Sequence, residues 1–206
     1  MFRKVLLLIL LAVPFAAARQ AYEETHSEVH PLLPGGTLRI QLPVGDLHIV
    51  KGSDQQNVHL SYTVRTNRES NLRDSRATFK KQSDGATIEF HSSYRGNTSI
   101  DAELEVPDPT ALEVHLKVGD LRMEGIHGNK YLVVKVGDIE VSGAGPDYRF
   151  VQADAGIGDV NLHPDGWQST LINYRESGWL GRKLSYNSDG KYDLRAQVSV
   201  GDIEIR

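Results

Sequence analysis

The stretch LKVGDLRMEGIHGNKYLVVKVGDIEVSG, residues 116–143, contains the motif Val-Gly-Asp-aliphatic twice. The motif recurs, once with Ile in place of Val, so that its five copies begin at Val44, Val118, Val136, Ile157 and Val200. Apolar residues alternate with other residues on both sides of each Gly-Asp. A motif used five times in 206 residues predicts a repeated structural unit.

The same alternation runs through most of the chain and is typical of half-buried β-strands. Clear examples are residues 38–44, 100–106 and 112–118. Pro-Asp-Pro at 107–109 separates the last two runs, because proline cannot continue a central strand. We therefore predict an all-β fold.

Two further segments complete this prediction. Residues 79–90, with Ser-Asp-Gly at 83–85 between two runs, predict a β-hairpin. Residues 67–76 carry charges but no apolar stripe, so we expect a loop there and no helix beyond residue 18.

The alternation slips by one residue at each Gly-Asp. Leu116 and Val118 share one parity, and the next apolar residue, Leu121, comes three positions later. A flat strand would then turn every later side chain outward, so we expect a bend that keeps Val118 and Leu121 on one core. Glycine permits the unusual backbone angles, and aspartate can bind nearby N–H groups. The motif therefore predicts structural corners at Gly45, Asp46, Gly119, Asp120, Gly137, Asp138, Gly158, Asp159, Gly201 and Asp202.

The spacing of the motifs predicts stacked rungs of about twenty residues. We expect an antiparallel, sandwich-like N-terminal part that continues, near Pro107, into a stacked β-solenoid-like part. The long interval between Gly158 and Gly201 would hold two rungs, one without the motif. Two packed sheets accept the same alternation, so both arrangements stay open.

The first residues predict a signal peptide. Arg3 and Lys4 precede an apolar run, residues 5–15, that is too short to span a bilayer, and small residues follow it. We expect cleavage after Ala18, which leaves 19–206 as a single adhesin-like domain; the alternative is an uncleaved anchor. Export would place the protein in the periplasm or at the cell surface.

Composition narrows the function classes. The chain lacks cysteine, which excludes disulfides and thiol catalysis. Its formal net charge is −4, and loss of the leader removes only positive charges. An acidic chain argues against nucleic acid and against electrostatic docking on anionic lipid.

Three segments carry a family resemblance: PGGTLRIQLPVGDLHIVKG (34–52), LEVHLKVGDLRMEGIHGNKYLVVKVGDIEVSG (112–143) and VSVGDIEIR (198–206). They resemble the bacterial putative-adhesin family, a domain of unknown function. The resemblance implies a β-strand repeat protein of the envelope or surface, for which adhesion is the family's provisional label. It supplies no catalytic motif, and residues 163–197 depart from the repeat.

We weighed metal and catalytic sites against structural roles. The five motif aspartates could form a calcium ladder, but the nine-residue, glycine-rich repeat of calcium-binding β-rolls is missing. The eight histidines are scattered, and G-x-S-x-G and H-E-x-x-H do not occur. We therefore predict no metal site, no cofactor and no enzymatic activity.

Residues 163–192 combine aromatic and basic side chains, which suit sugars, peptides or a partner protein. The candidate binding residues are Trp167, Tyr174, Arg175, Trp179 and Arg182. The alternative is a cap on the end of the stacked core.

Together, these features predict a non-enzymatic exported β-repeat protein that binds a component of the cell envelope or surface. One alternative is a structural or stress-response envelope protein that self-associates through strand edges. An enzyme acting on polysaccharide is a third, for which the sequence offers no motif.

Overall fold

The computed structural model describes residues 21–33, 35–92, 97–143, 147–163, 172–177 and 181–206, with the backbone alone for 172–177. Within these ranges the chain forms seventeen strands and one short helix, so the predicted all-β class is confirmed. The predicted leader, residues 1–18, lies outside the described residues.

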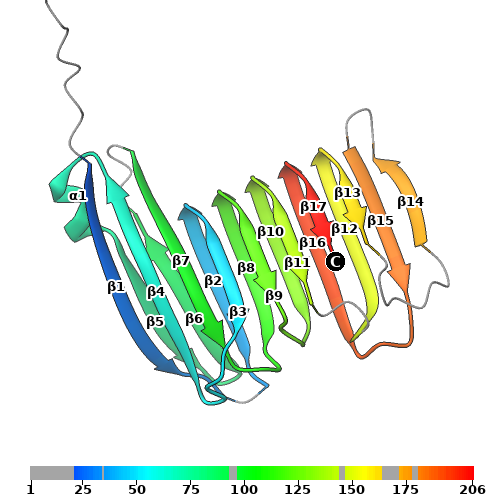
Figure 1. Ribbon diagram of the computed structural model, residues 1–206, viewed down its shortest axis with the longest axis horizontal. Helices are drawn as coiled ribbons and strands as arrows, with labels where there is room; N and C mark the ends of the chain where they lie inside the picture. The colour runs from blue at the N-terminus through cyan, green and yellow to red at the C-terminus, as the bar shows by residue number, and fades with distance from the viewer. Residues whose placement is uncertain (1–20, 34, 93–96, 144–146, 164–171, 178–180) are drawn as a thin grey trace, which may run out of the picture.

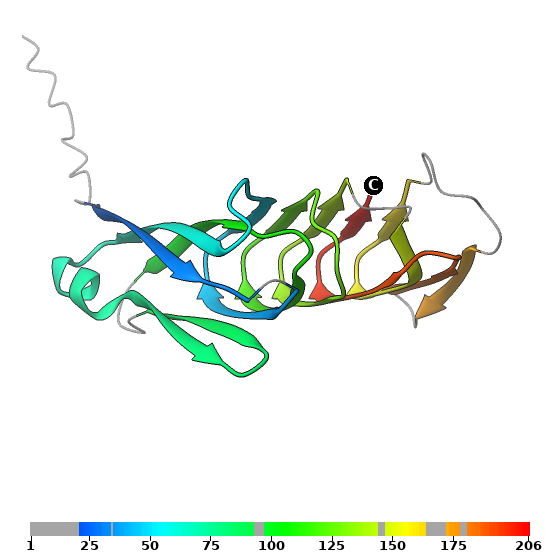
Figure 2. The ribbon, with the colours of Figure 1, turned by 90° about the horizontal axis from the view of Figure 1, so that it is seen from below.

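The strands form two mixed sheets, seen as a long row in Figure 1 and from below in Figure 2. Sheet A has the order β1 (Tyr22–Pro31), β4 (Asn57–Thr66), β7 (Thr98–Val106), β3 (Leu47–Lys51), β9 (Leu121–Glu124), β11 (Ile139–Ser142), β17 (Ile203–Ile205) and β13 (Val160–Leu162). Sheet B has the order β14 (Ile172–Ser177), β15 (Gly181–Asn187), β12 (Tyr148–Ile157), β16 (Tyr192–Val200), β10 (Lys130–Val136), β8 (Ala111–Val118), β2 (Thr37–Val44), β6 (Gly85–His91) and β5 (Arg76–Gln82).

Each Gly-Asp motif joins a strand of sheet B to a strand of sheet A. The five pairs, which we call Gly-Asp units, are β2–β3, β8–β9, β10–β11, β12–β13 and β16–β17. Neighbouring units pair in parallel in both sheets. All five motifs therefore lie along one edge of the molecule, the Gly-Asp edge. The chain passes from sheet A back to sheet B at the opposite edge, the return edge.

The units do not stack in chain order. The C-terminal unit β16–β17 lies between β10–β11 and β12–β13, and it pairs in parallel with both (Figure 1). The expectation of two rungs between Gly158 and Gly201 is wrong. That interval instead contains β14 and β15, an antiparallel pair that continues sheet B beyond β12.

Antiparallel strands extend the row at its other end. In sheet A, β1, β4 and β7 pair antiparallel beside β3, and in sheet B the predicted hairpin is confirmed as β5 and β6. The expected loop at 67–76 contains a helix, α1 (Glu69–Asp74). The helix is held by the buried Asn71 amide, which donates to the hydroxyls of Thr66 and Thr98, both at 3.2 Å, and by Leu72, which packs against the core.

The core lies between the sheets, and inward residues such as Ile40, Val114 and Leu132 are fully buried. The first residue of each motif was expected to face this core, and that expectation is wrong. These residues are 37–48% exposed: Val44, Val118, Val136, Ile157 and Val200. In each of the four parallel ladders that join neighbouring units in sheet B, the pairing skips the position just before these residues, so the strand leaves its regular path before the motif begins. The core therefore continues from Leu116 to Leu121, five positions later.

Candidate functional site

The glycines of the Gly-Asp edge allow the units to approach closely. All five have φ between 128° and 136°, a region that side chains disfavour. The N–H of Gly119 donates to the carbonyl of Val136 at 3.0 Å, and a Cβ on Gly137 would lie 2.0 Å from the carbonyl oxygen of Gly119. Neighbouring turns are thus packed backbone against backbone, with no room for a side chain.

The aspartates of the motifs are joined in a hydrogen-bonded row. The backbone N–H of Asp120 donates to Oδ1 of Asp46 at 3.0 Å, and that of Asp138 donates to Oδ1 of Asp120 at 3.0 Å. The row continues through Asp202 to Asp159, with both distances 2.7 Å. Each accepting carboxylate thus satisfies an N–H of the next turn, and together the side chains give this edge a line of negative charge.

The five exposed aliphatic residues lie beside this acidic row. They occupy matching register positions on neighbouring strands, so their side chains form a continuous ridge, the aliphatic ridge: Val44, Val118, Val136, Val200 and Ile157. Strands in a sheet are about 4.8 Å apart, which sets the spacing of the ridge. Only three other large apolar side chains in the described residues are comparably exposed: Val29, Leu33 and Tyr131. A contiguous exposed apolar row marks a candidate interaction surface.

Two hollows lie near the ridge, one on the outer face of each sheet. The hollow over sheet A has about 340 Å³ and carries acidic groups, among them Asp46, Asp101 and Glu103. The hollow over sheet B has about 440 Å³ and contains Lys117 and Lys135. The Gly-Asp edge therefore presents an apolar ridge with negative charge on one side and positive charge on the other.

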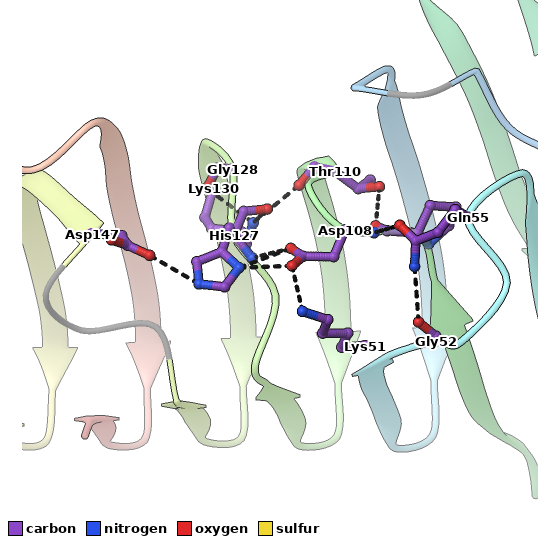
Figure 3. A network of polar contacts seen from close by, with 10 residues as sticks. Lys51, Gly52, Gln55, Asp108, Thr110, His127, Gly128, Lys130 and Asp147 are labelled. Carbon is purple, nitrogen blue, oxygen red and sulfur yellow. Dashed lines mark hydrogen bonds and ion pairs between the residues drawn. The ribbon is translucent and has the colours of Figure 1, made fainter.

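The return edge holds a polar network that joins separate loops (Figure 3). Asp108 accepts the backbone N–H of His127 at 2.7 Å and lies 2.8 Å from Nζ of Lys51. The His127 ring bridges Asp108 and Asp147, with nitrogen–oxygen distances of 2.8 and 2.9 Å. Burial acts to raise the pKa of Asp108, but hydrogen bonds from Lys51 and His127 lower it to about 2.

Lys130 lies beside this network and is buried, with 2% of the residue exposed. Its Nζ donates to the carbonyls of Thr110, His127 and Gly128 at 2.9–3.0 Å. Burial lowers the pKa of Lys130 to about 7, and the charge of Asp108 opposes that decrease. Three acceptors match the three protons of an ammonium group, so this lysine fastens two loops together.

This network resembles an acid–base site in composition, but its polar groups are occupied by one another and by backbone groups. His127 is held by carboxylates on both sides, and Lys130 points into backbone carbonyls. The arrangement connects loops from β7, β9 and β11 to the strands that follow. We assign it a structural role.

The predicted binding residues are only partly described. Trp167 and Trp179 lie outside the described residues, and so do the side chains of Tyr174 and Arg175 in β14. Arg182, in β15, forms an ion pair with Asp159 at 3.3 Å. β14 and β15 lie at the end of the row opposite β1 (Figure 1). In the residues that the structure describes, no group of His, Asp or Glu has the arrangement of a metal site.

No family model and no curated protein matches this chain. Among solved structures, a putative cell adhesion protein from Clostridium sporogenes is 14% identical with a TM-score of 0.52, and the match covers 88% of this chain and 99% of that one. A putative adhesin from Bacteroides fragilis is 8% identical with a TM-score of 0.39, over 89% and 97% of the two chains. The resemblance to putative adhesins expected from the sequence is confirmed, and the first match shows a shared fold.

None of the helices in the described part of the chain has the length and apolar character needed to cross a membrane.

Proposed function

We propose that this protein is an exported, non-enzymatic β-repeat protein that binds a component of the cell envelope or surface through its Gly-Asp edge. The aliphatic ridge carries the proposal. Five half-exposed aliphatic side chains in register offer apolar area that a partner can bury, and such continuous exposure is uncommon on a soluble domain. The solved neighbour from Clostridium sporogenes is described as a putative cell adhesion protein, which supports the same class of function.

In this proposal the ten Gly-Asp residues are structural corners of a solenoid-like body. Two observations support this role. The glycines have positive φ and leave no space for a Cβ, and aspartates accept a hydrogen bond from the backbone of the next turn. The corners hold the ridge straight and evenly spaced. The aromatic segment 163–192 stays a predicted cap or second contact at the end of the row.

Co-sedimentation tests the proposal. Purified protein lacking the predicted leader is mixed with isolated cell-wall and membrane fractions, with and without a calcium chelator. Pelleting with one fraction, unchanged by the chelator, is expected and identifies the class of target. The proposal fails if the protein pellets with no fraction, and loss of pelleting with chelator would indicate a calcium-dependent aspartate row.

Self-association is a second candidate, favoured by the charges that flank the ridge. Lys117 and Lys135 lie on one side, and Asp120 and Asp138 on the other. A twofold axis along the ridge would bring the lysines of one copy opposite the aspartates of the next. Analytical ultracentrifugation over a range of concentrations would then show a salt-sensitive dimer.

A further inference from the structure

We propose that the hollow over sheet B binds an acidic saccharide whose anionic groups pair with Lys117 and Lys135. This inference rests on the proposed function, because it names a ligand class for the same edge. It begins with the lysines. They occupy equivalent positions on β8 and β10, between the register pairs Leu116↔Val134 and Val118↔Val136. Both are exposed, and neither forms an ion pair with any described residue.

Several other cations of this face do have partners. Four of its other basic groups sit opposite acids on neighbouring strands, Arg39 with Glu113, Lys80 with Glu89, Arg149 with Asp193, and Lys183 with Asp154, and Arg195 lies over the ring of Phe150. Like charges placed side by side destabilise a sheet. Two lysines side by side on neighbouring strands, neither with an acidic partner in the described residues, therefore point to a partner that supplies negative charge.

The hollow has the size and lining of a ligand site. Its volume of about 440 Å³ lies within the usual range for small ligands, and its other polar lining residues include Gln41, His91, Ser92 and Glu89, whose carboxylate is paired with Lys80 at 3.0 Å. His115, also in the lining, packs edge-to-face on Tyr131, with ring centroids 5.8 Å apart. Tyr131 is 39% exposed. Tyr131 itself lies outside the lining, so the hollow offers two cations beside several hydrogen-bonding groups, which suit a sugar ring that carries a carboxylate, sulfate or phosphate.

The shape of the edge favours a narrow chain over a broad surface. The aspartate row lies just across the ridge from the lysines, so a flat anionic membrane would meet both signs of charge. A single saccharide chain lying on the sheet B side meets the lysines without reaching that row. A narrow acidic polymer is therefore the occupant that the charges fit.

Isothermal titration calorimetry of the purified protein tests the inference. The probes are a short oligogalacturonate, a neutral galacto-oligosaccharide of the same length, and an oligomer of glycerol phosphate. The oligogalacturonate is expected to bind and to weaken as salt is added. The phosphate oligomer tells which anion is preferred. Equal binding of the neutral sugar would overturn the proposal, as would the absence of binding by both acidic probes.

Variants test the named residues. Lys117→Gln and Lys135→Gln should each weaken binding at least about tenfold, because a hydrogen-bonded charge pair is lost. The matched control is Lys81→Gln, which removes an exposed charge from β5 of the same sheet and should leave binding unchanged. Unchanged binding in the double lysine variant would exclude this site.

A further probe separates a saccharide from other partners. A poly-glutamate peptide that binds as tightly as the oligogalacturonate would overturn the assignment to saccharide. If the double lysine variant still pellets with envelope fractions while neither protein binds acidic sugar, this inference fails and the proposed function stands.

Discussion

The Gly-Asp edge and the return edge join the same two sheets, yet they are built in different ways. At the Gly-Asp edge the same two-residue turn occurs five times, and neighbouring turns are joined by hydrogen bonds of the backbone and of the aspartate side chains. At the return edge the loops differ in length and sequence, and side chains such as Asp108, His127 and Lys130 join them. The first edge is regular and presents an exposed aliphatic row, whereas at the second the polar side chains bind one another and the backbone of neighbouring loops.

The difference indicates a division of labour. A regular edge gives evenly spaced apolar and charged rows, which suit a repetitive or extended partner. An irregular edge whose polar groups bind one another suits stability. Substitutions at the return edge should therefore change unfolding, and substitutions of exposed residues at the Gly-Asp edge should change binding.

The largest effect is expected for Gly137→Val. The new Cβ would meet the carbonyl oxygen of Gly119, and valine disfavours φ near 130°. We expect a loss of more than about 4 kcal/mol in unfolding free energy, or failure to fold. Urea unfolding measures this. Gly125→Ala is the control, because φ there is 68° but the nearest atom is 3.9 Å away, and it should cost only about 1–2 kcal/mol. Equal losses would contradict the close packing of the Gly-Asp edge.

Asp108→Ala should be next, at about 2–4 kcal/mol, because it leaves the N–H of His127 and the charge of Lys51 without their partner. The effect should depend on pH. The folded pKa of about 2 lies below the unfolded value of about 3.9, so the stabilisation is present above about pH 4 and is lost as pH falls through 2. Unfolding curves of both proteins at several acidic pH values should converge near pH 2. A constant difference would rule out this titration.

Lys130→Met tests the buried amine. The folded pKa of about 7 lies below the unfolded value of about 10.4, so between these values the unfolded chain binds more protons. The unfolding free energy of the wild-type protein should therefore rise relative to the variant as pH increases from 7 to 10. Parallel pH profiles for the two proteins would show that the three carbonyls hold the ammonium form throughout.

Asp138→Asn should have the smallest effect on stability, below about 1 kcal/mol. The amide oxygen can still accept the N–H of Asp202, and the backbone of Gly137 is untouched. Thermal unfolding of Asp138→Asn and of Gly137→Val, measured side by side, compares the contributions of the aspartate and the glycine of one corner. A loss as large as that of the valine variant would show that the carboxylate, not the backbone angle, holds the corner.

Local features were predictable from the sequence, and long-range ones were not. The alternation, the hairpin and the special role of Gly137 and its equivalents follow from properties of neighbouring residues. The insertion of β16–β17 between earlier units does not, because all five motifs are nearly identical and any order would satisfy their pairing. The network of Asp108, His127 and Asp147 spans three loops that only the fold brings together.

The aliphatic ridge was missed for a specific reason. Val118 has the parity of a core residue, and an alternating pattern assumes that pairing continues regularly up to the motif. The skipped position before it breaks that assumption in every unit. The sequence did contain a signal for the ridge. A structural corner needs only glycine and aspartate, yet all five copies also have an aliphatic residue directly before the glycine.

The central claim is that the ridge binds and the return edge stabilises. Its most direct test is co-sedimentation with envelope fractions of Val118→Ser/Val136→Ser, with Asp108→Ala for comparison and thermal unfolding of both. Because the two valines are nearly half exposed, the double variant should unfold close to wild type yet lose most of its pelleting, whereas folded Asp108→Ala should pellet normally and unfold at lower temperature. Unchanged pelleting of the valine variant, from a fraction that retains wild-type protein, would contradict the account.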